Sequence, residues 1–151
     1  LIMLAIIYFK SESWKKITSL AFLITVGTSA LVTNIIKVII ERPRPIHNDA
    51  WQDLIHALEG TSDSSYSFFS SHSATTFSMA IFFFLIMRKL QQSPIYGYTA
   101  VIWATSVAYS RIYVAKHFPL DVMCGILFGI VMGVVGYQLL NLFIKSKSTK
   151  I

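Results

Sequence analysis

Long apolar runs alternate with short polar connections along this chain. Four runs can be marked, near residues 17–40, 73–87, 95–113 and 120–144. A membrane-spanning helix needs roughly 20 predominantly apolar residues, and the second run reaches that length only if it extends from Ser71 to Leu90. The residues do not alternate in polarity as barrel strands would. The pattern predicts an all-α fold, a polytopic transmembrane helical bundle with four full spans.

A shorter apolar stretch, "LIMLAIIYF", opens the chain at residues 1–9. Nine residues are too few to cross about 30 Å of hydrocarbon as a helix. We interpret this stretch as the end of a longer helix. Residues 1–151 are then expected to form a single transmembrane domain that is incomplete at its N-terminal end.

The polar connections divide by charge. The segments 10–16, 87–92 and 145–150 hold eight of the thirteen Lys and Arg residues, with one acidic residue against them. Four alternating spans place these segments on one side, which the positive-inside rule makes cytoplasmic. The connections 41–72 and 111–119 then share the outer face. We expect an integral protein of the bacterial inner (plasma) membrane, with these two connections facing the periplasm or the outside.

The composition supports a membrane protein. Hydrophobic residues make up 54% of the chain and charged residues 13%, against about 45–50% and 25% in soluble domains. The net charge of +6 does not indicate a nucleic-acid partner, because the Lys and Arg are not clustered as a binding groove requires. The single cysteine, Cys124, cannot form an internal disulfide, and we expect it in the packed core.

The loop 46–66 is acidic and contains a second periodic pattern. Four of its apolar residues fall on one face of a helix: Trp51, Leu54, Ile55 and Leu58. We predict a short helix between Asn48 and Gly60, on the extracytoplasmic side. It is either an interfacial helix beside a lipid access route or a loop helix packed on the spans.

Glycines recur every four residues in the last apolar run, at Gly125, Gly129 and Gly133. Small residues at this spacing let helix backbones approach closely. We therefore expect a helix-packing face here rather than a gating hinge.

Three polar clusters lie at the outer ends of the apolar runs, and the first joins Lys37 to "ERPRP" at 41–45. Pro43 and Pro45 predict that the helix does not continue past Arg42, because the residue before a proline leaves the α region. Lys37 and Arg44 are close enough in sequence to converge on one anion. The alternative is that Lys37 snorkels to the interface, as lysines near span ends commonly do.

The second cluster is "SFFSSHS", residues 67–73. Ser70 or Ser71 can cap the helix that follows through its side-chain oxygen. A helix N-terminus offers unpaired N–H groups and a positive dipole end, which suit phosphate, and His72 lies in that first turn. A capped helix with an interfacial histidine is the alternative interpretation.

The third cluster is "SRIYVAKHFPLD", residues 110–121. Arg111 ends one span, and Pro119 suits the first turn of the next. Asp121 follows His117 by one helical turn, on the same face. A carboxylate there can hold an imidazole N–H and fix the tautomer, as a nucleophile or base requires. The alternative is a salt-bridged interfacial turn.

Taken together, the clusters suit a phosphoryl group. Three cations and a helix N-terminus can hold its oxygens, while two histidines can divide the work of nucleophile and acid. Two histidines and an aspartate could in principle ligate zinc, but the neighbouring cations argue against a divalent metal. A single carboxylate also disfavours magnesium or calcium. We therefore expect neither a metal nor another cofactor.

The clusters also resemble the signature of the type 2 phosphatidic acid phosphatase family, K-x6-R-P, P-S-G-H and S-R-x5-H-x3-D. The first and third segments match at every fixed position, from Lys37 to "RP" at 44–45 and from "SR" at 110–111 to Asp121. The second reads "FSSH" at 69–72, with Phe69 for proline and Ser71 for glycine. The resemblance covers roughly residues 15–145. It implies the six-span fold of membrane lipid phosphatases, a group related to bacterial undecaprenyl-diphosphatases and lipid A phosphatases.

The resemblance also implies residue roles. His117 is the nucleophile that becomes phosphohistidine, Asp121 orients it, and His72 protonates the leaving oxygen and then activates water. The expected phosphate-binding residues are Lys37, Arg44, Ser70, Ser71 and Arg111. The implied reaction is metal-independent dephosphorylation of a membrane lipid phosphate or diphosphate, with undecaprenyl diphosphate or a lipid A phosphate favoured. The alternative is a membrane protein that binds or transports anionic lipid headgroups without chemistry. The sequence leaves the oligomeric state open.

Overall fold

Five α-helices account for most of the computed structural model, which describes residues 1–11, 14–47 and 66–148. Their bounds agree with the apolar runs, and the second run does begin at Ser71. A short 3-10 helix, η2, follows α2. The elements are α1 (Ile2–Lys10), α2 (Lys15–Ile40), η2 (Pro45–His47), α3 (Ser71–Lys89), α4 (Ile95–Tyr113) and α5 (Pro119–Ser148). The described residues form no strand, which confirms the all-helical class.

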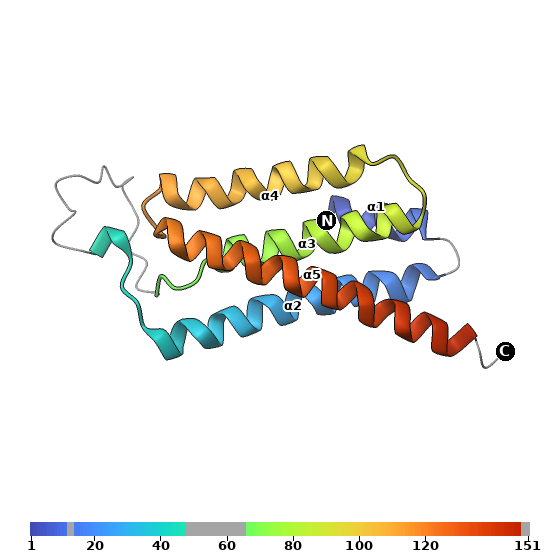
Figure 1. The fold of residues 1–151 in the computed structure, drawn as a ribbon, viewed down its shortest axis with the longest axis horizontal. Coiled ribbons are helices and arrows are strands. Elements are labelled where there is room, and N and C mark those ends of the chain that lie inside the picture. Colours follow the sequence, from blue (N-terminus) through green and yellow to red (C-terminus); the bar gives the residue numbers. More distant parts are fainter. Residues whose placement is uncertain (12–13, 48–65, 149–151) are drawn as a thin grey trace.

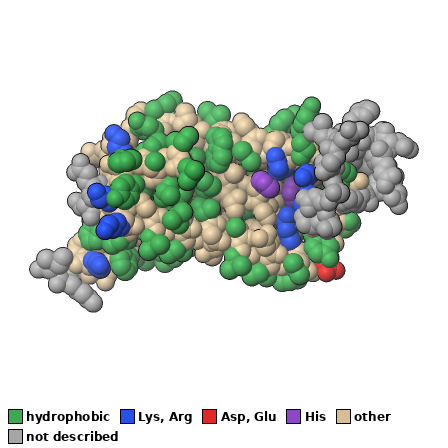
Figure 2. Space-filling view, turned by 180° about the vertical axis from the view of Figure 1, so that it is seen from behind, with side chains coloured by type: hydrophobic (Ala, Val, Ile, Leu, Met, Phe, Trp, Pro, Cys, Tyr) green, Lys and Arg blue, Asp and Glu red, His purple; other side chains and the backbone are tan. Residues whose placement is uncertain are grey.

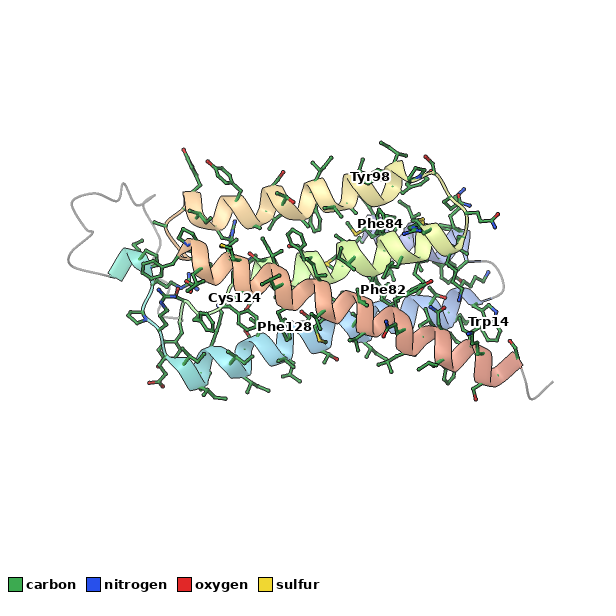
Figure 3. All side chains as sticks on the ribbon, in the orientation of Figure 1. Trp14, Phe82, Phe84, Tyr98, Cys124 and Phe128 are labelled. Carbon is green, nitrogen blue, oxygen red and sulfur yellow. The ribbon has the colours of Figure 1, made fainter. Side chains whose placement is uncertain are left out.

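Helix α3 lies at the centre of the bundle. It contacts each of the other four helices, and Figure 1 shows α4 and α2 along opposite sides of it with α5 crossing in front. Aromatic rings join the layers: Phe82 lies edge-on to Phe22 of α2, with ring centroids 5.7 Å apart. Phe84 meets Tyr98 of α4 at 5.8 Å (Figure 3). Cys124 of α5 is half-buried, so the expected core position is only partly met.

The outer helices expose many large apolar side chains. Among the described helices, α2 and α5 are long and apolar enough to cross a membrane. Contiguous exposed apolar surface is rare on soluble monomers, and it matches a protein embedded in lipid. The count of four spans stays a prediction. Examples of the exposed side chains are Leu23, Leu31, Ile102, Leu127 and Leu139.

The polar connections gather at the two ends of the bundle. One end holds the end of α2, the start of α3 and the connection from α4 to α5 (Figure 1). The other end holds the α1–α2 and α3–α4 connections and the end of α5, as the charge pattern predicted. Lys and Arg colour both ends in Figure 2, with His at only one of them on the face shown. The predicted helix at 48–60 lies outside the described residues.

The glycines of α5 are packing positions, as predicted. A Cβ added at Gly125 would come within 2.7 Å of the Ser70 carbonyl oxygen, and one at Gly129 within 2.4 Å of the Ala74 carbonyl oxygen. At Gly133 it would meet the side chain of Ile81 at 2.8 Å. These contacts are all with α3 or the residue before it, so the glycines let α5 lie directly against the central helix.

We predict that Gly129→Ala destabilises the bundle and lowers its thermal unfolding temperature in detergent. The added methyl group cannot fit 2.4 Å from a backbone oxygen unless α5 moves away from α3. Gly27→Ala is the matched control, because nothing lies within 4 Å of a Cβ at Gly27. Equal unfolding temperatures for the two variants would contradict the close α3–α5 contact.

Candidate active site

The first cluster begins where α2 ends. Glu41 terminates the helix in the left-handed conformation, with φ of 51°, and its N–H donates to the Lys37 carbonyl at 3.0 Å. The helix thus stops before Arg42, as the two prolines predicted. Lys37 is half-buried in the last turn, while Arg44 is buried in the connection that follows.

The start of α3 is fixed by Ser70. This residue is the N-cap: its hydroxyl accepts the Ser73 N–H at 3.3 Å. Its own N–H donates to the backbone oxygen of Asp121 at 3.1 Å, which docks α3 onto the first turn of α5. The hydroxyl of Ser71 instead points to the Asn34 side chain of α2, 3.4 Å away. His72 follows in the first turn of α3 and is exposed.

Phe69 occupies the position where the family signature has proline. Its side chain is buried, and its ring lies 5.1 Å from that of Phe128 on α5, measured between centroids. Figure 3 labels Phe128, which belongs to α5. The departure from proline therefore supplies another apolar contact between the start of α3 and α5.

His117 lies in the connection between α4 and α5, just before Pro119 opens α5 as predicted. Only 3% of the residue is exposed. Its Nδ1 is 2.7 Å from the backbone carbonyl oxygen of Ser67. A carbonyl can only accept, so Nδ1 carries the proton in this contact. The Nε2 atom of the neutral ring then keeps its lone pair.

Asp121 does not make the hydrogen bond to His117 that the spacing predicted. Its Oδ2 is 3.9 Å from Nδ1 of His117, although the two residues do lie one turn apart on the same face. The carboxylate is engaged elsewhere. Oδ1 pairs with Nη1 of Arg42 at 2.7 Å, while Oδ2 accepts the Ser67 hydroxyl and the N–H of Phe118, the latter at 2.9 Å. The predicted direct hydrogen bond is therefore wrong.

Burial and charge keep His117 neutral. Removal from water, which disfavours the charged ring, lowers its pKa from the ordinary 6.5 to about 4, and the positive charges of Lys37 and Arg44 act in the same direction. The Ser67 carbonyl and Asp121 oppose this shift but do not cancel it. At neutral pH the ring is uncharged.

Two of the three predicted cations act on both histidines. Lys37 and Arg44 act electrostatically on His117 and on His72 alike, and Arg111 acts on His72. The Arg111 guanidinium donates to the hydroxyl of its neighbour Ser110, from Nε at 3.1 Å and from Nη2 at 3.0 Å. The structure thus brings the three predicted cations and both histidines to one end of the bundle.

Sequence reasoning missed three residues of this site. Lys116 adds a fourth positive charge near His72, and Arg42 and Ser67 hold the Asp121 carboxylate. Arg42 and Ser67 stand inside the clusters already singled out, "ERPRP" and "SFFSSHS". Their partners lie 79 and 54 residues away in sequence, so no local spacing could have assigned these contacts.

The sequence of this chain is similar to those of known phosphatases. Two similar proteins are lipid A 4'-phosphatases. The one from Porphyromonas gingivalis is 32% identical over 110 residues, which is 72% of this chain and 44% of the relative. The one from Bacteroides thetaiotaomicron is 27% identical over 128 residues, or 82% of this chain and 55% of the relative. The chain spans about half the length of these curated relatives.

The similar solved structure and the matching family model point to the same superfamily. A crystal structure of a transmembrane PAP2 type phosphatidylglycerolphosphate phosphatase from Bacillus subtilis superposes with a TM-score of 0.66 and 25% identity, over 96% of this chain and 66% of that one. The model of the PAP2 superfamily matches residues 18–145, a range that holds all three polar clusters. The chain belongs to the PAP2 superfamily.

Proposed function

We propose that this protein is a metal-independent phosphatase of membrane lipid phosphates that works through a phosphohistidine on His117. The observation that carries the proposal is the state of His117: buried, neutral, and held through Nδ1 by the Ser67 carbonyl. Its Nε2 lone pair is then free to attack, in the field of Lys37 and Arg44. Membership of the PAP2 superfamily and the lipid phosphatases among its relatives support the same chemistry.

The first step transfers the phosphoryl group to the protein. Nε2 of His117 attacks phosphorus, and the bond from phosphorus to the lipid oxygen breaks as the N–P bond forms. His72, as the protonated imidazolium, gives its proton to the leaving oxygen and becomes a neutral imidazole. The cations hold the non-bridging oxygens, which suits phosphoryl transfer because positioning and charge stabilisation supply most of its catalysis.

The second step returns His117 to its neutral state. Water attacks phosphorus, His72 accepts the water proton, and the N–P bond breaks with release of inorganic phosphate. The difference in exposure supports this division of roles. His117 is buried, as a protected nucleophile should be, whereas His72 is exposed and open to both leaving group and water.

The occupied carboxylate of Asp121 supports a reaction without metal. Both of its oxygens already accept hydrogen bonds, and one is paired with the Arg42 guanidinium at 2.7 Å. Binding a divalent ion would require those contacts to break. The positive charge that a metal would supply to the phosphate comes instead from Lys37, Arg44 and Arg111.

A lipid A phosphate is the leading substrate candidate, because two relatives from different bacteria are lipid A 4'-phosphatases. Undecaprenyl diphosphate is the second. The site lies at one end of the bundle, where a membrane lipid would present its headgroup. The basic segments at the opposite end favour a cytoplasmic position for that end, and this charge pattern supports a periplasmic or outer position for the proposed site.

The direct test is phosphate release by the full-length protein in EDTA. We expect turnover of at least one lipid phosphate from a panel of lipid A, undecaprenyl diphosphate, phosphatidylglycerophosphate and phosphatidic acid. Vanadate should inhibit as a phosphate mimic. Loss of turnover in EDTA, with recovery on adding a divalent ion, would contradict the metal-independent mechanism.

The two histidines should differ in a phosphoenzyme assay with p-nitrophenyl phosphate. His117→Ala should abolish both phosphoenzyme and turnover. His72→Ala should lower turnover by about 10²–10⁴-fold, the usual contribution of acid–base catalysis, and phosphohistidine should accumulate because the good leaving group needs no acid. If the His117→Ala protein became radiolabelled and the His72→Ala protein did not, His72 would be the nucleophile and the two roles would be exchanged. Unchanged lipid transport or binding in His117→Ala, with no turnover in the parent protein, would favour the headgroup carrier.

The charge state of His117 can be measured by NMR titration of histidine labelled at Cε1, assigned through the His117→Ala spectrum. We expect a midpoint near 4. The ring should therefore stay neutral at pH 5.5, where an unperturbed histidine is about 90% protonated. Lys37→Met removes a positive charge and should move the midpoint upward. A midpoint at or above 6.5 in the parent protein would contradict the proposed neutral nucleophile.

The side of the membrane can be tested with an impermeant thiol reagent on intact cells. In a Cys124→Ala background, a cysteine replacing Ser62 of the acidic loop should react. One replacing Ser148, exposed at the opposite end of the bundle, should react only after lysis. The reverse pattern would reverse the orientation.

A further inference from the structure

We propose that Arg42 is a positioning residue, which acts on the nucleophile through Asp121 and Ser67 and does not bind the substrate phosphate. This inference rests on the proposed phosphatase activity. Arg42 is the first arginine of "ERPRP", two residues before Arg44, which aligns with the phosphate-binding arginine of the family signature.

Arg42 contacts three separate segments. Its Nη1 pairs with Oδ1 of Asp121 at 2.7 Å, at the start of α5. Its guanidinium lies over the ring of Phe118, 4.3 Å from the centroid, in the connection between α4 and α5. Its backbone oxygen accepts the N–H of Ser67 at 2.7 Å, just before α3. One residue thus joins the end of α2 to both sides of the nucleophile.

Ser67 passes this constraint to His117. Its N–H is held by Arg42, its hydroxyl donates to Asp121, and its carbonyl accepts from Nδ1 of His117. Ser67 and Asp121 are completely buried, so the contact between their side chains is shielded from water in the intact protein. Any shift of Arg42 or Asp121 therefore moves the carbonyl that fixes the imidazole.

Arg42 also controls what the Asp121 carboxylate can do. Oδ2 lies 3.9 Å from Nδ1 of His117, close enough to compete with the Ser67 carbonyl for the ring proton after a small movement. While Arg42 and the Ser67 hydroxyl occupy the carboxylate, the N–H of His117 Nδ1 keeps donating to the Ser67 carbonyl. Without Arg42, a buried and unpaired carboxylate would draw the imidazole toward itself and favour its protonated form.

The remaining charges around His117 come from other elements: Lys37 at the end of α2 and Arg44 in the connection after it. These belong to the proposed phosphate clamp, together with Arg111. Arg42 is committed to a carboxylate instead. Its loss should therefore lower kcat with little change in KM, whereas loss of a clamp residue such as Arg111 should raise KM.

The test compares Arg42→Ala, Arg42→Lys and Arg88→Ala in the full-length protein, with kcat and KM measured on a lipid phosphate that the parent hydrolyses. Arg88 is exposed at the opposite end of the bundle and serves as the control. We expect Arg42→Ala to lower kcat by about 10- to 100-fold, the worth of one charge-assisted hydrogen bond, with KM within about twofold. Guanidinium ion should restore part of kcat, because the Arg42 side chain is 33% exposed.

Arg42→Lys should lie between the parent and Arg42→Ala, since it keeps the charge but loses the planar contact with Phe118. Ser67→Ala keeps the carbonyl and removes only the hydroxyl, so its kcat should fall less than that of Arg42→Ala. This variant also serves if Arg42→Ala does not fold. An unchanged kcat in folded Arg42→Ala, or a raised KM at constant kcat, would overturn the proposal.

A second readout separates this inference from the proposed activity. The NMR midpoint of His117 should rise in Arg42→Ala, because the released carboxylate favours the charged ring, and should stay unchanged in Arg88→Ala. If the parent protein hydrolyses no lipid phosphate, the proposed function fails while this titration still tests the contact. An unchanged midpoint in folded Arg42→Ala would overturn the positioning role.

Discussion

The site depends on one hydrogen bond, from Nδ1 of His117 to the backbone oxygen of Ser67, 2.7 Å long. A backbone carbonyl cannot donate or ionise, so it selects one imidazole tautomer without adding a charge. Burial and two nearby cations then hold the ring neutral. The proposed mechanism needs a neutral imidazole as nucleophile and positive charges nearby to hold the phosphate. The carbonyl allows both, because it orients the ring without adding a negative charge that would favour its protonation.

That hydrogen bond joins two connections, the one before α3 and the one between α4 and α5, and a backbone hydrogen bond beside it joins the helices that follow them. The Ser70 N–H binds the backbone oxygen of Asp121 at 3.1 Å, so the start of α3 and the start of α5 are fixed to each other. The glycine face of α5 permits this approach, since a Cβ at Gly125 would come within 2.7 Å of the Ser70 oxygen. Helix packing in the interior therefore sets the geometry at the end.

Local sequence rules predicted the parts of the fold that local physics decides. Apolar run lengths gave the helix bounds, the prolines after Lys37 ended α2, and Ser70 was one of two predicted caps. The ligands of Asp121 were beyond such rules. Spacing placed it one turn from His117, but the choice between an imidazole, a guanidinium and a hydroxyl depends on segments 54 and 79 residues away. The helix predicted within the acidic loop stays a prediction.

The position of the phosphate on the His117 ring tests the proposed nucleophile directly. Rapid quench of the full-length protein with radiolabelled or ³¹P-labelled substrate, followed by separation of the two phosphohistidine isomers, distinguishes the nitrogens. Because the Ser67 carbonyl occupies Nδ1, we expect phosphate on Nε2. Phosphate on Nδ1, or on no histidine under conditions of steady turnover, would contradict it.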